Sequence, residues 1–408
     1  MTIKPPTPDA IYISPGDPYG APRGGQTAFA IQALNAFGSR FALVAPDESE
    51  RSPIGVWFLS EWQGRPIWRF NIGSYAPKNK SRRPLIPRRV VFRSLIAKRL
   101  PAIREIPTRN LFCDSPELLG VLGRYEWSSF CYRFAGLNNP VGSSRYPYFR
   151  FLAKRFHFRM VNNLVRLKPD ALLASADREA IEKFEKENQR ILGDCRLHFF
   201  PTRFNERIFH PSDPQIQRCA LNLTDSAPVL VSVGRLCWIK GWRLALETLV
   251  ELKKIYPNVK LIFVGDGEDR LSLEAYSRKL GVSDNIRIEG FLSPEETCRR
   301  LVAADVYLCA SYREGWSVAM TEALGCGKIC VSTKVSGVKD MICDGVNGRI
   351  VNERNPVVFA QAVVDALSFK ETSDVPRRRS LELAQNYSSL KLAKDWGNVW
   401  NPLASRTQ

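Results

Sequence analysis

The chain contains only three histidines, His157, His198 and His210, and none of them stands at a metal-ligand spacing. Its ten cysteines are scattered along the sequence. Cys326 lies close to Cys330, but no second pair and no nearby histidine completes a zinc pattern. The sequence therefore predicts reduced thiols that lie mostly in the core, and no metal ion.

Long apolar runs are also absent. No run of about 18 apolar residues suggests a membrane span, and the opening segment MTIKPPTPDAIYISPG lacks the apolar core of a signal peptide. We therefore expect a cytoplasmic protein. The 408 residues, 44% hydrophobic and 25% charged, suffice for two ordinary globular domains.

Acidic residues are scarce in the first half of the chain. Residues 1–212 carry 33 Lys and Arg against 18 Asp and Glu, whereas residues 213–408 carry 26 against 23. Residues 65–109 hold thirteen basic residues and one acid, and they include the run RRPLIPRRVVFRSLIAKRL at 82–100. This mixture of basic and apolar residues suits contact with an anionic membrane surface.

Two other interpretations of the basic segment stay open: a solvated basic face and a nucleic-acid surface. No zinc-finger spacing, RNA-binding sheet signature or heptad-backed basic helix accompanies it. We therefore expect no nucleic-acid partner. The expected location is the cytoplasm, with peripheral contact on the inner face of the cytoplasmic membrane as a separate hypothesis.

The first half of the chain begins with the pattern of a parallel α/β sheet. A strand is expected at 10–14, followed by a loop that ends in Arg23-Gly24-Gly25, a helix at 26–38 and a strand at 41–46. Residues 47–110 show few periodic stretches. Further strands are expected at 111–115, 130–136 and 169–175, and an exposed helix at 177–190.

The βα alternation becomes regular in the second half. Ser293, Pro294 and Glu296 form a helix-start signal. Strands are expected at 228–234, 259–265, 286–290, 305–311 and 328–332, and helices at 242–256, 269–281 and 293–304. With a proline-bounded linker at 201–214, we expect two doubly wound domains, 1–208 and 209–385, and a last helix at about 386–408 that packs back on the first domain.

The run from Glu314 to Glu322 sets two carboxylates eight residues apart around a turn that opens a helix. At the rise of a helix they would start about 12 Å apart, and one carboxylate could then contact each end of a sugar nucleotide. A buried helix start with an incidental Glu at each end is the structural alternative.

A second group of charges favours the ligand interpretation. Gly234 and Arg235 close a strand, and Lys240 stands just before the next helix, so two cations would lie at the carboxyl end of a sheet beside a helix N-terminus. A diphosphate would fit there. Alone, such a loop is usually a polar turn, but together with Glu314 and Glu322 it indicates a donor site.

The turn Gly265-Asp266-Gly267-Glu268 does not indicate a dinucleotide site. The fingerprint requires a third glycine where this chain has Arg270, so we expect neither NAD nor FAD. A tight turn near the ligand is the favoured interpretation, and a metal role for Asp266 is the weaker one.

Several motifs occur in the order seen in glycosyltransferase family 4: VGRL, FVGDGE, IRIEGF, AADVYLCASYREGWSVAMTEALGCGKICVST and DGVNGRIV. The chain resembles that family densely over residues 228–352, and more weakly through Gly24-Gly25 and the linker PTRFNERIFHP. The resemblance implies the GT-B fold, in which two Rossmann-like domains face each other across a cleft, with acceptor binding in the first domain and donor binding in the second.

The resemblance also implies roles for individual residues. Arg235 and Lys240 would hold the donor diphosphate beside Gly234. Glu322 would accept hydrogen bonds from the nucleotide ribose, and Glu314 would face the hydroxyls of the donor sugar. Catalysis would rest on Glu314, Arg235 and Lys240.

Backbone groups would complete the donor site. The amides of Gly315, Trp316, Ser317 and Val318 would support the sugar or its phosphate, and Gly24 and Gly25 would let the opposite domain's backbone approach the diphosphate. Many family members also carry a histidine beside the donor sugar, where this chain has Phe134-Ala135-Gly136. Either this part of the comparison is out of register or another residue substitutes.

The resemblance thus implies a retaining, metal-independent glycosyltransferase that needs no cofactor besides a nucleotide-sugar co-substrate. Its acceptor would be a glycan or lipid-linked glycan, in cell-surface polysaccharide or lipopolysaccharide biosynthesis. A sugar-nucleotide epimerase or hydrolase on the same fold is one alternative. A non-catalytic nucleotide-sugar-binding partner subunit, or a nucleic-acid-binding protein, is the other.

Overall fold

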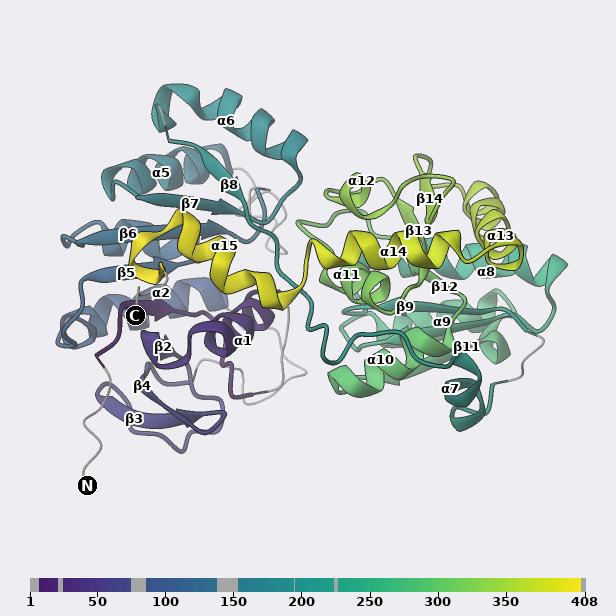
Figure 1. Ribbon diagram of the computed structural model, residues 1–408, viewed down its shortest axis with the longest axis horizontal. Helices are drawn as coiled ribbons and strands as arrows, with labels where there is room; N and C mark the ends of the chain where they lie inside the picture. The colour runs from purple at the N-terminus through teal and green to yellow at the C-terminus, as the bar shows by residue number, and fades with distance from the viewer. Residues whose placement is uncertain are drawn as a thin grey trace. The chain divides into compact units, whose positions relative to one another are not determined.

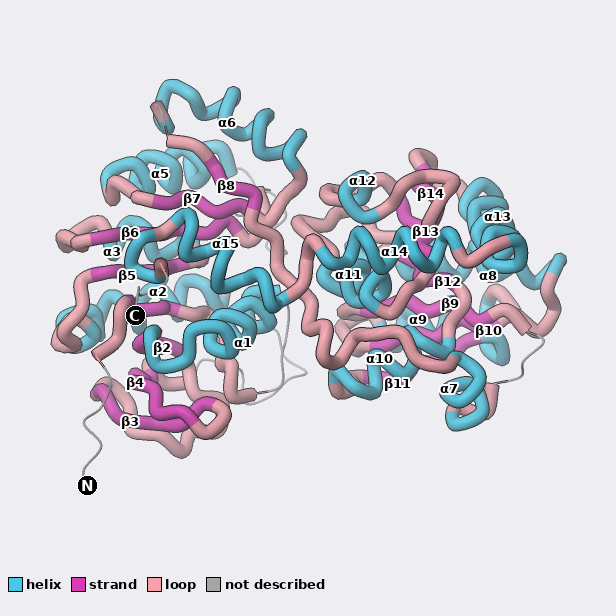
Figure 2. The backbone as a smooth tube through the Cα atoms, viewed as in Figure 1, coloured by secondary structure: helices cyan, strands magenta, loops and turns pink. Residues whose placement is uncertain are grey.

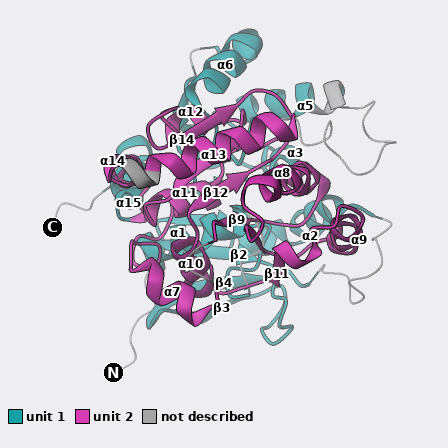
Figure 3. Cartoon of the chain, turned by 90° about the vertical axis from the view of Figure 1, so that its right-hand side faces the viewer, with its two compact units in different colours: residues 1–202, 390–408 teal, residues 203–389 magenta. Residues whose placement is uncertain are grey.

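The computed structural model describes residues 7–20, 25–74, 86–137, 153–193, 195–223 and 227–404. The chain forms two compact units, which Figure 3 colours separately: unit 1 comprises residues 1–202 and 390–408, and unit 2 comprises residues 203–389. The first boundary lies inside the proline-bounded stretch 201–214. Each unit contains a largely parallel sheet with helices on its faces (Figure 2), which confirms the predicted α/β class.

Unit 1 is built on an eight-stranded sheet of order β3-β4-β2-β1-β5-β6-β7-β8, in which only the β3–β4 pair is antiparallel (Figure 1). Its strands are β1 (Ala10–Ile13), β2 (Phe41–Ala45), β3 (Trp57–Trp62), β4 (Arg65–Asn71), β5 (Asn110–Cys113), β6 (Ser129–Phe134), β7 (Ala171–Ala174) and β8 (Leu197–Phe199). Its helices include α1 (Gly25–Phe37), α2 (Arg88–Ile103), α3 (Leu119–Leu122), α5 (Ala153–Arg166), α6 (Arg178–Leu192) and α15 (Leu392–Val399).

Both faces of this sheet are covered, as parallel strands require. Helices α2, α3, α5 and α6 supply apolar side chains to one core, and α1 and α15 supply those of the other. On the second face Trp396 of α15 contacts Phe29, Phe37 and Phe112, with ring centroids 4.5–5.5 Å apart. The last helix of the chain therefore belongs to unit 1.

The segment 47–110, in which few elements are expected from sequence, contains the β3–β4 hairpin and α2. The apolar side chains Phe92, Ile96 and Leu100 of α2 are at most 1% exposed and lie in the core. These three side chains are therefore not available to a lipid surface, which limits the expected membrane contact to the other residues of the segment. Ile86 and Val90, which are 57% and 45% exposed, and the exposed basic side chains remain for such a contact, and residues 75–85 lie outside the described residues.

Unit 2 has a six-stranded parallel sheet of order β11-β10-β9-β12-β13-β14, which is the doubly wound 3-2-1-4-5-6 order of a Rossmann fold. Its strands are β9 (Val229–Val233), β10 (Lys260–Val264), β11 (Ile286–Gly290), β12 (Val306–Cys309), β13 (Ile329–Thr333) and β14 (Gly348–Val351). Its helices are α7 (Pro214–Ala220), α8 (Trp242–Ile255), α9 (Arg270–Lys279), α10 (Pro294–Ala303), α11 (Val318–Gly325), α12 (Val338–Met341), α13 (Pro356–Thr372) and α14 (Val375–Gln385).

The sequence pattern of unit 2 translates directly into these elements. Strands such as LIFV are continuous apolar runs, and VLVSV is apolar except for Ser232, because helices cover both faces of the sheet. The hydroxyl of Ser293 accepts a hydrogen bond from the amide of Glu296 at 3.2 Å, which confirms the predicted start of α10. All ten cysteines are free, and seven of them are buried.

None of the described helices is long and apolar enough to cross a membrane.

Candidate active site

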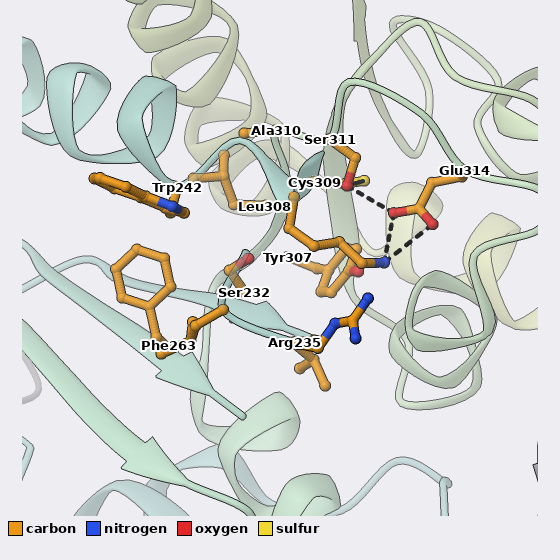
Figure 4. A pocket seen from close by; sticks show the side chains of 14 residues that line it. Ser232, Arg235, Trp242, Phe263, Tyr307, Leu308, Cys309, Ala310, Ser311 and Glu314 are labelled. Carbon is orange, nitrogen blue, oxygen red and sulfur yellow. Dashed lines mark hydrogen bonds and ion pairs between the residues drawn. The ribbon is translucent and has the colours of Figure 1, made fainter. Parts of the chain in front are cut away.

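A pocket opens in unit 2 where the strand order reverses. Strand β9 pairs with β10 on one side and with β12 on the other, so the helices that follow β9 and β12 leave to opposite faces of the sheet. The pocket lies at the carboxyl ends of these two strands and is lined by the loop from Gly234 to Lys240, the end of β12 and Glu314 (Figure 4). This crevice is the place where open α/β sheets bind ligands.

Two glycines make the loop around the pocket possible. Gly241, at φ 69°, precedes α8, and a Cβ added there would lie 1.8 Å from the carbonyl oxygen of Ala310 at the end of β12. Gly265 has φ 131°, and a Cβ added there would lie 2.1 Å from the carbonyl oxygen of Gly234. Because only glycine fits both the dihedral angle and the contact, these positions bring the loops after β9, β10 and β12 together.

Lys240 and Glu314 form an ion pair inside the pocket. The Lys240 Nζ donates hydrogen bonds to both carboxylate oxygens of Glu314, at 2.8 and 3.0 Å, and the hydroxyl of Ser311 donates to the same carboxylate at 2.6 Å. Burial alone would lower the pKa of Lys240, but attraction to Glu314 outweighs it and raises this pKa above the ordinary value. The ammonium is therefore charged at neutral pH.

Arg235 is the unpaired cation of the pocket. Its side chain is exposed and makes no hydrogen bond or ion pair with any residue in the described part of the chain. Figure 4 shows its guanidinium directed toward the side of the pocket that holds Glu314. Since Glu314 neutralises Lys240, the guanidinium of Arg235 leaves the pocket with a net positive charge suited to an anion.

The segment 315–318 leads into α11 and leaves backbone donors available. Ser317 is the N-cap, and its hydroxyl accepts a hydrogen bond from the amide of Met320 at 3.3 Å. No described group accepts a hydrogen bond from the amides of Val318 and Ala319. The side chain of Trp316 is only 7% exposed and packs against the ring of Tyr387.

Glu322 lies on α11 and is partly buried. Its carboxyl group has no hydrogen-bond partner among the described residues. Burial, and secondarily the nearby thiol of Cys298, raises the pKa of this carboxyl to about 8. Because this carboxyl has no described hydrogen-bond partner, hydrogen bonds donated by the hydroxyls of a ligand would stabilise it.

One geometric expectation is wrong. Helix α11 begins only at Val318, after the Ser317 cap, so Glu314 stands in the preceding loop and the helical-rise estimate of the separation from Glu322 does not apply. Glu314 is instead placed by its contacts with Lys240 and Ser311.

The remaining expected residues are placed as follows. Asp266 bonds to the amide of Gly267 at 2.7 Å and pairs with Arg270 at 3.7 Å, as a residue that shapes a turn does. Gly25 is the first residue of α1 in unit 1, whereas Gly24 lies outside the described residues. Gly234 adopts φ 148° and packs against the side chain of Lys240.

Unit 1 contains a buried acidic group that the sequence interpretation missed. Asp114 follows β5, which neighbours β1 at the point where this sheet also reverses its strand order. Its carboxylate oxygens are buried, and burial outweighs the attraction to Arg133 and raises the pKa of this carboxyl to about 7. The only sequence signal was an acid at a strand end. Ala135, in the stretch where the histidine is expected, is exposed and offers no polar side chain.

Comparison with known proteins agrees with this geometry. Residues 214–381 match the family described as "Glycosyl transferases group 1". The matched residues lie within unit 2 and make up less than half of the chain. The lipopolysaccharide core biosynthesis glycosyltransferase LpsE of Rhizobium meliloti is 32% identical over 148 residues, which cover 36% of this chain and 42% of LpsE. The alignments cover less than half the length of the first curated relatives that the chain matches.

Solved structures show the same fold over almost the whole chain. The sucrose-phosphate synthase of Thermosynechococcus elongatus superposes with a TM-score of 0.77 at 18% identity, over 96% of this chain and 97% of that one. HepE of Anabaena, in complex with UDP and glucose, superposes with a TM-score of 0.68 at 15% identity, over 96% and 98% of the two chains. These neighbours confirm the predicted GT-B fold class.

The steric role of Gly241 gives a test of the pocket's construction. We expect Gly241→Ala to destabilise unit 2 by more than about 3 kcal/mol, because left-handed strain adds to a clash with the carbonyl of Ala310. Gly281→Ala is the matched control, since Gly281 has φ 68° with nothing within 4 Å of its added Cβ. It should cost only about 1–2 kcal/mol. Urea unfolding of both variants measures the difference, and equal losses would contradict the assigned contact.

Proposed function

We propose that this protein is a retaining, metal-independent glycosyltransferase that moves a sugar from a nucleoside-diphosphate donor to a hydroxyl of a glycan or lipid-linked glycan. The observation that carries this proposal is the unpaired Arg235 beside the Lys240–Glu314 pair at the switch point of unit 2. Such a cluster suits a diphosphate, and the family match supplies the reaction class.

Each charged group has a distinct role in this proposal. Arg235 and Lys240 bind the diphosphate, Glu322 accepts hydrogen bonds from the ribose, and Glu314 contacts the hydroxyls of the donor sugar. The amides at the start of α11 add donors that face the sugar or its phosphate. The crystal structure of HepE in complex with UDP and glucose supports a donor of this kind.

The catalytic contribution is electrostatic. As the bond between the sugar and the diphosphate breaks, negative charge builds on the departing phosphate, and Arg235 and Lys240 stabilise that charge without a metal ion. A phosphate oxygen of the donor takes the proton of the acceptor hydroxyl on the same face of the sugar, so that no protein nucleophile is needed and the anomeric configuration is kept. Glu314 and Ser311 hold Lys240 in place before the donor binds.

The acceptor assignment rests on the relatives. LpsE takes part in lipopolysaccharide core biosynthesis by its name, which supports a lipid-linked glycan acceptor and a role in cell-surface polysaccharide or lipopolysaccharide biosynthesis. A thermal-shift screen across UDP, GDP and ADP and their sugars would identify the donor, because a bound ligand raises the unfolding temperature by mass action.

Removing the donor-site charges should abolish turnover. We expect Lys240→Ala and Glu322→Ala each to lower the rate of sugar transfer by about 100-fold or more, since Lys240→Ala loses a charged contact to the diphosphate and Glu322→Ala loses the hydrogen bonds from the ribose. Lys254→Ala is the matched control, because Lys254 is 65% exposed and pairs only with Glu251 on the surface of α8. The measurement is release of nucleoside diphosphate from the screened donor in the presence of a lipid-linked glycan extract.

Two results would contradict the proposal. Unchanged turnover in both Lys240→Ala and Glu322→Ala would show that this pocket is not the donor site. Rapid conversion of donor alone, to an epimer or to free sugar, would favour an epimerase or hydrolase on the same fold instead.

Peripheral membrane contact through α2 is a further part of the proposal. Arg88, Arg93 and Lys98 are exposed on this helix, while Phe92, Ile96 and Leu100 lie in the core. The contact is therefore electrostatic and weakens with salt.

We expect the protein to float with vesicles of phosphatidylglycerol and phosphatidylcholine, and not with phosphatidylcholine alone. The double variant Arg93→Glu, Lys98→Glu should lose this binding, whereas Lys183→Glu, an exposed change on α6, should keep it. Equal flotation with both kinds of vesicle would exclude the electrostatic contact.

A further inference from the structure

Two thiols from different helices of unit 2 meet next to the candidate donor site. Cys298 lies in α10 and Cys326 is the C-cap residue of α11, and their sulfur atoms are 3.7 Å apart. All ten cysteines lie in the described part of the chain, and this is the only sulfur–sulfur contact among them. The pair is not visible as a motif because 28 residues separate the two positions.

The two thiols share their surroundings with Glu322. Cys326 follows Glu322 by four residues, so both side chains lie on the same side of α11. The thiol of Cys298 also contributes to the raised pKa of Glu322. A chemical change at the sulfur pair would therefore change the electrostatic environment of Glu322, the carboxyl group proposed to bind the ribose.

Cys298 has the character of a reactive thiol. A hydrogen bond from Cys326, with further contributions from His210 and Lys328, outweighs burial and lowers the pKa of Cys298 to about 6. A thiolate is the form of cysteine that reacts with oxidants. Cys298 is 8% exposed and Cys326 is 3% exposed, so a small oxidant would reach Cys298 first.

The end of α11 has little room to absorb a displacement. A Cβ added at Gly325 would lie 2.5 Å from the ring of Phe204, and one added at Gly327 would lie 2.9 Å from the side chain of Arg377. A disulfide has a sulfur–sulfur length of about 2.05 Å, so the two sulfurs must approach by more than an ångström. Because binding groups must be held within about 0.5 Å of their productive positions, we expect this approach to weaken the contacts of Glu322, which lies one helical turn before Cys326.

We propose that Cys298 and Cys326 are a reversible dithiol–disulfide site that is oxidised by a hydroperoxide, and that the disulfide weakens nucleoside-diphosphate binding at the adjacent site. The second part rests on the proposed function. In the first step, the Cys298 thiolate attacks hydrogen peroxide, forming a sulfenic acid and releasing hydroxide. In the second step, the sulfur of Cys326 attacks the sulfur of the Cys298 sulfenic acid. The hydroxyl group leaves with the thiol proton of Cys326 as water. A thiol reductant such as dithiothreitol reverses the bond.

The experiment uses the full chain, reduced and then treated with hydrogen peroxide. Free thiols are blocked with N-ethylmaleimide, and peptide mass spectrometry locates any disulfide. Calorimetry with UDP, GDP and ADP measures nucleotide affinity before oxidation, after it, and after dithiothreitol. We expect a linked peptide pair containing Cys298 and Cys326, at least a tenfold loss of affinity for the nucleotide that binds, and recovery on reduction.

Two variants separate this site from general oxidation. Cys298→Ser should form no linked peptide and should keep its nucleotide affinity in peroxide. Cys219→Ser, which removes the exposed cysteine of α7, should behave as the native chain does. The coupling is reciprocal. If the disulfide lowers nucleotide affinity by a given factor, saturating nucleotide should lower the disulfide-to-dithiol equilibrium constant by that same factor.

The outcomes are distinguishable. Absence of the linked peptide, with other thiols oxidised, would overturn the proposal, and so would a complete disulfide with unchanged nucleotide affinity. If the reduced protein bound no nucleoside diphosphate, the proposed function would fail, and the peptide map would still decide whether the disulfide forms.

Discussion

The close approach of Gly241 to the carbonyl of Ala310 is the steric constraint on which the candidate site depends. It brings the start of α8 against the end of β12, at the point where the sheet of unit 2 reverses its strand order. Lys240 stands directly before Gly241, in the loop that follows β9. Glu314 stands four residues after Ala310, in the loop that follows β12. The ion pair between them is therefore a consequence of how two backbones pack, and it exists before any ligand arrives.

Charge balance determines what this arrangement can bind. Glu314 neutralises Lys240, and its side chain is only 9% exposed, so the pair is held in a partly desolvated place where electrostatic contacts are strong. Arg235 adds an uncompensated cation at the same crevice. A ligand with a diphosphate can pair with Arg235 and compete with Glu314 for Lys240, which frees the Glu314 carboxylate to accept hydrogen bonds from sugar hydroxyls. A neutral ligand gains neither contact.

The fold of unit 2 could be predicted from sequence because its strands are apolar runs between clear turn and cap signals, as at Ser293. The β3–β4 hairpin of unit 1 could not, since Arg65 and Glu61 interrupt its apolar pattern at an exposed sheet edge. The residues of the candidate donor site were proposed from their motifs. The position of Glu314 depends on the Ser317 cap and on the contact with Lys240, and neither can be read from the spacing of the two carboxylates. The contact between Cys298 and Cys326 arises only from the packing of α10 against α11.

The central claim is that Arg235 and the Lys240–Glu314 pair form a diphosphate site. It is tested most directly by calorimetric titration of native protein and Arg235→Ala with the nucleoside diphosphate that binds and with the corresponding nucleoside. The account predicts that Arg235→Ala binds the diphosphate at least about tenfold more weakly, because a charged hydrogen bond contributes about 1.5–3 kcal/mol, while nucleoside affinity stays the same. Equal affinity of both proteins for the diphosphate would contradict it.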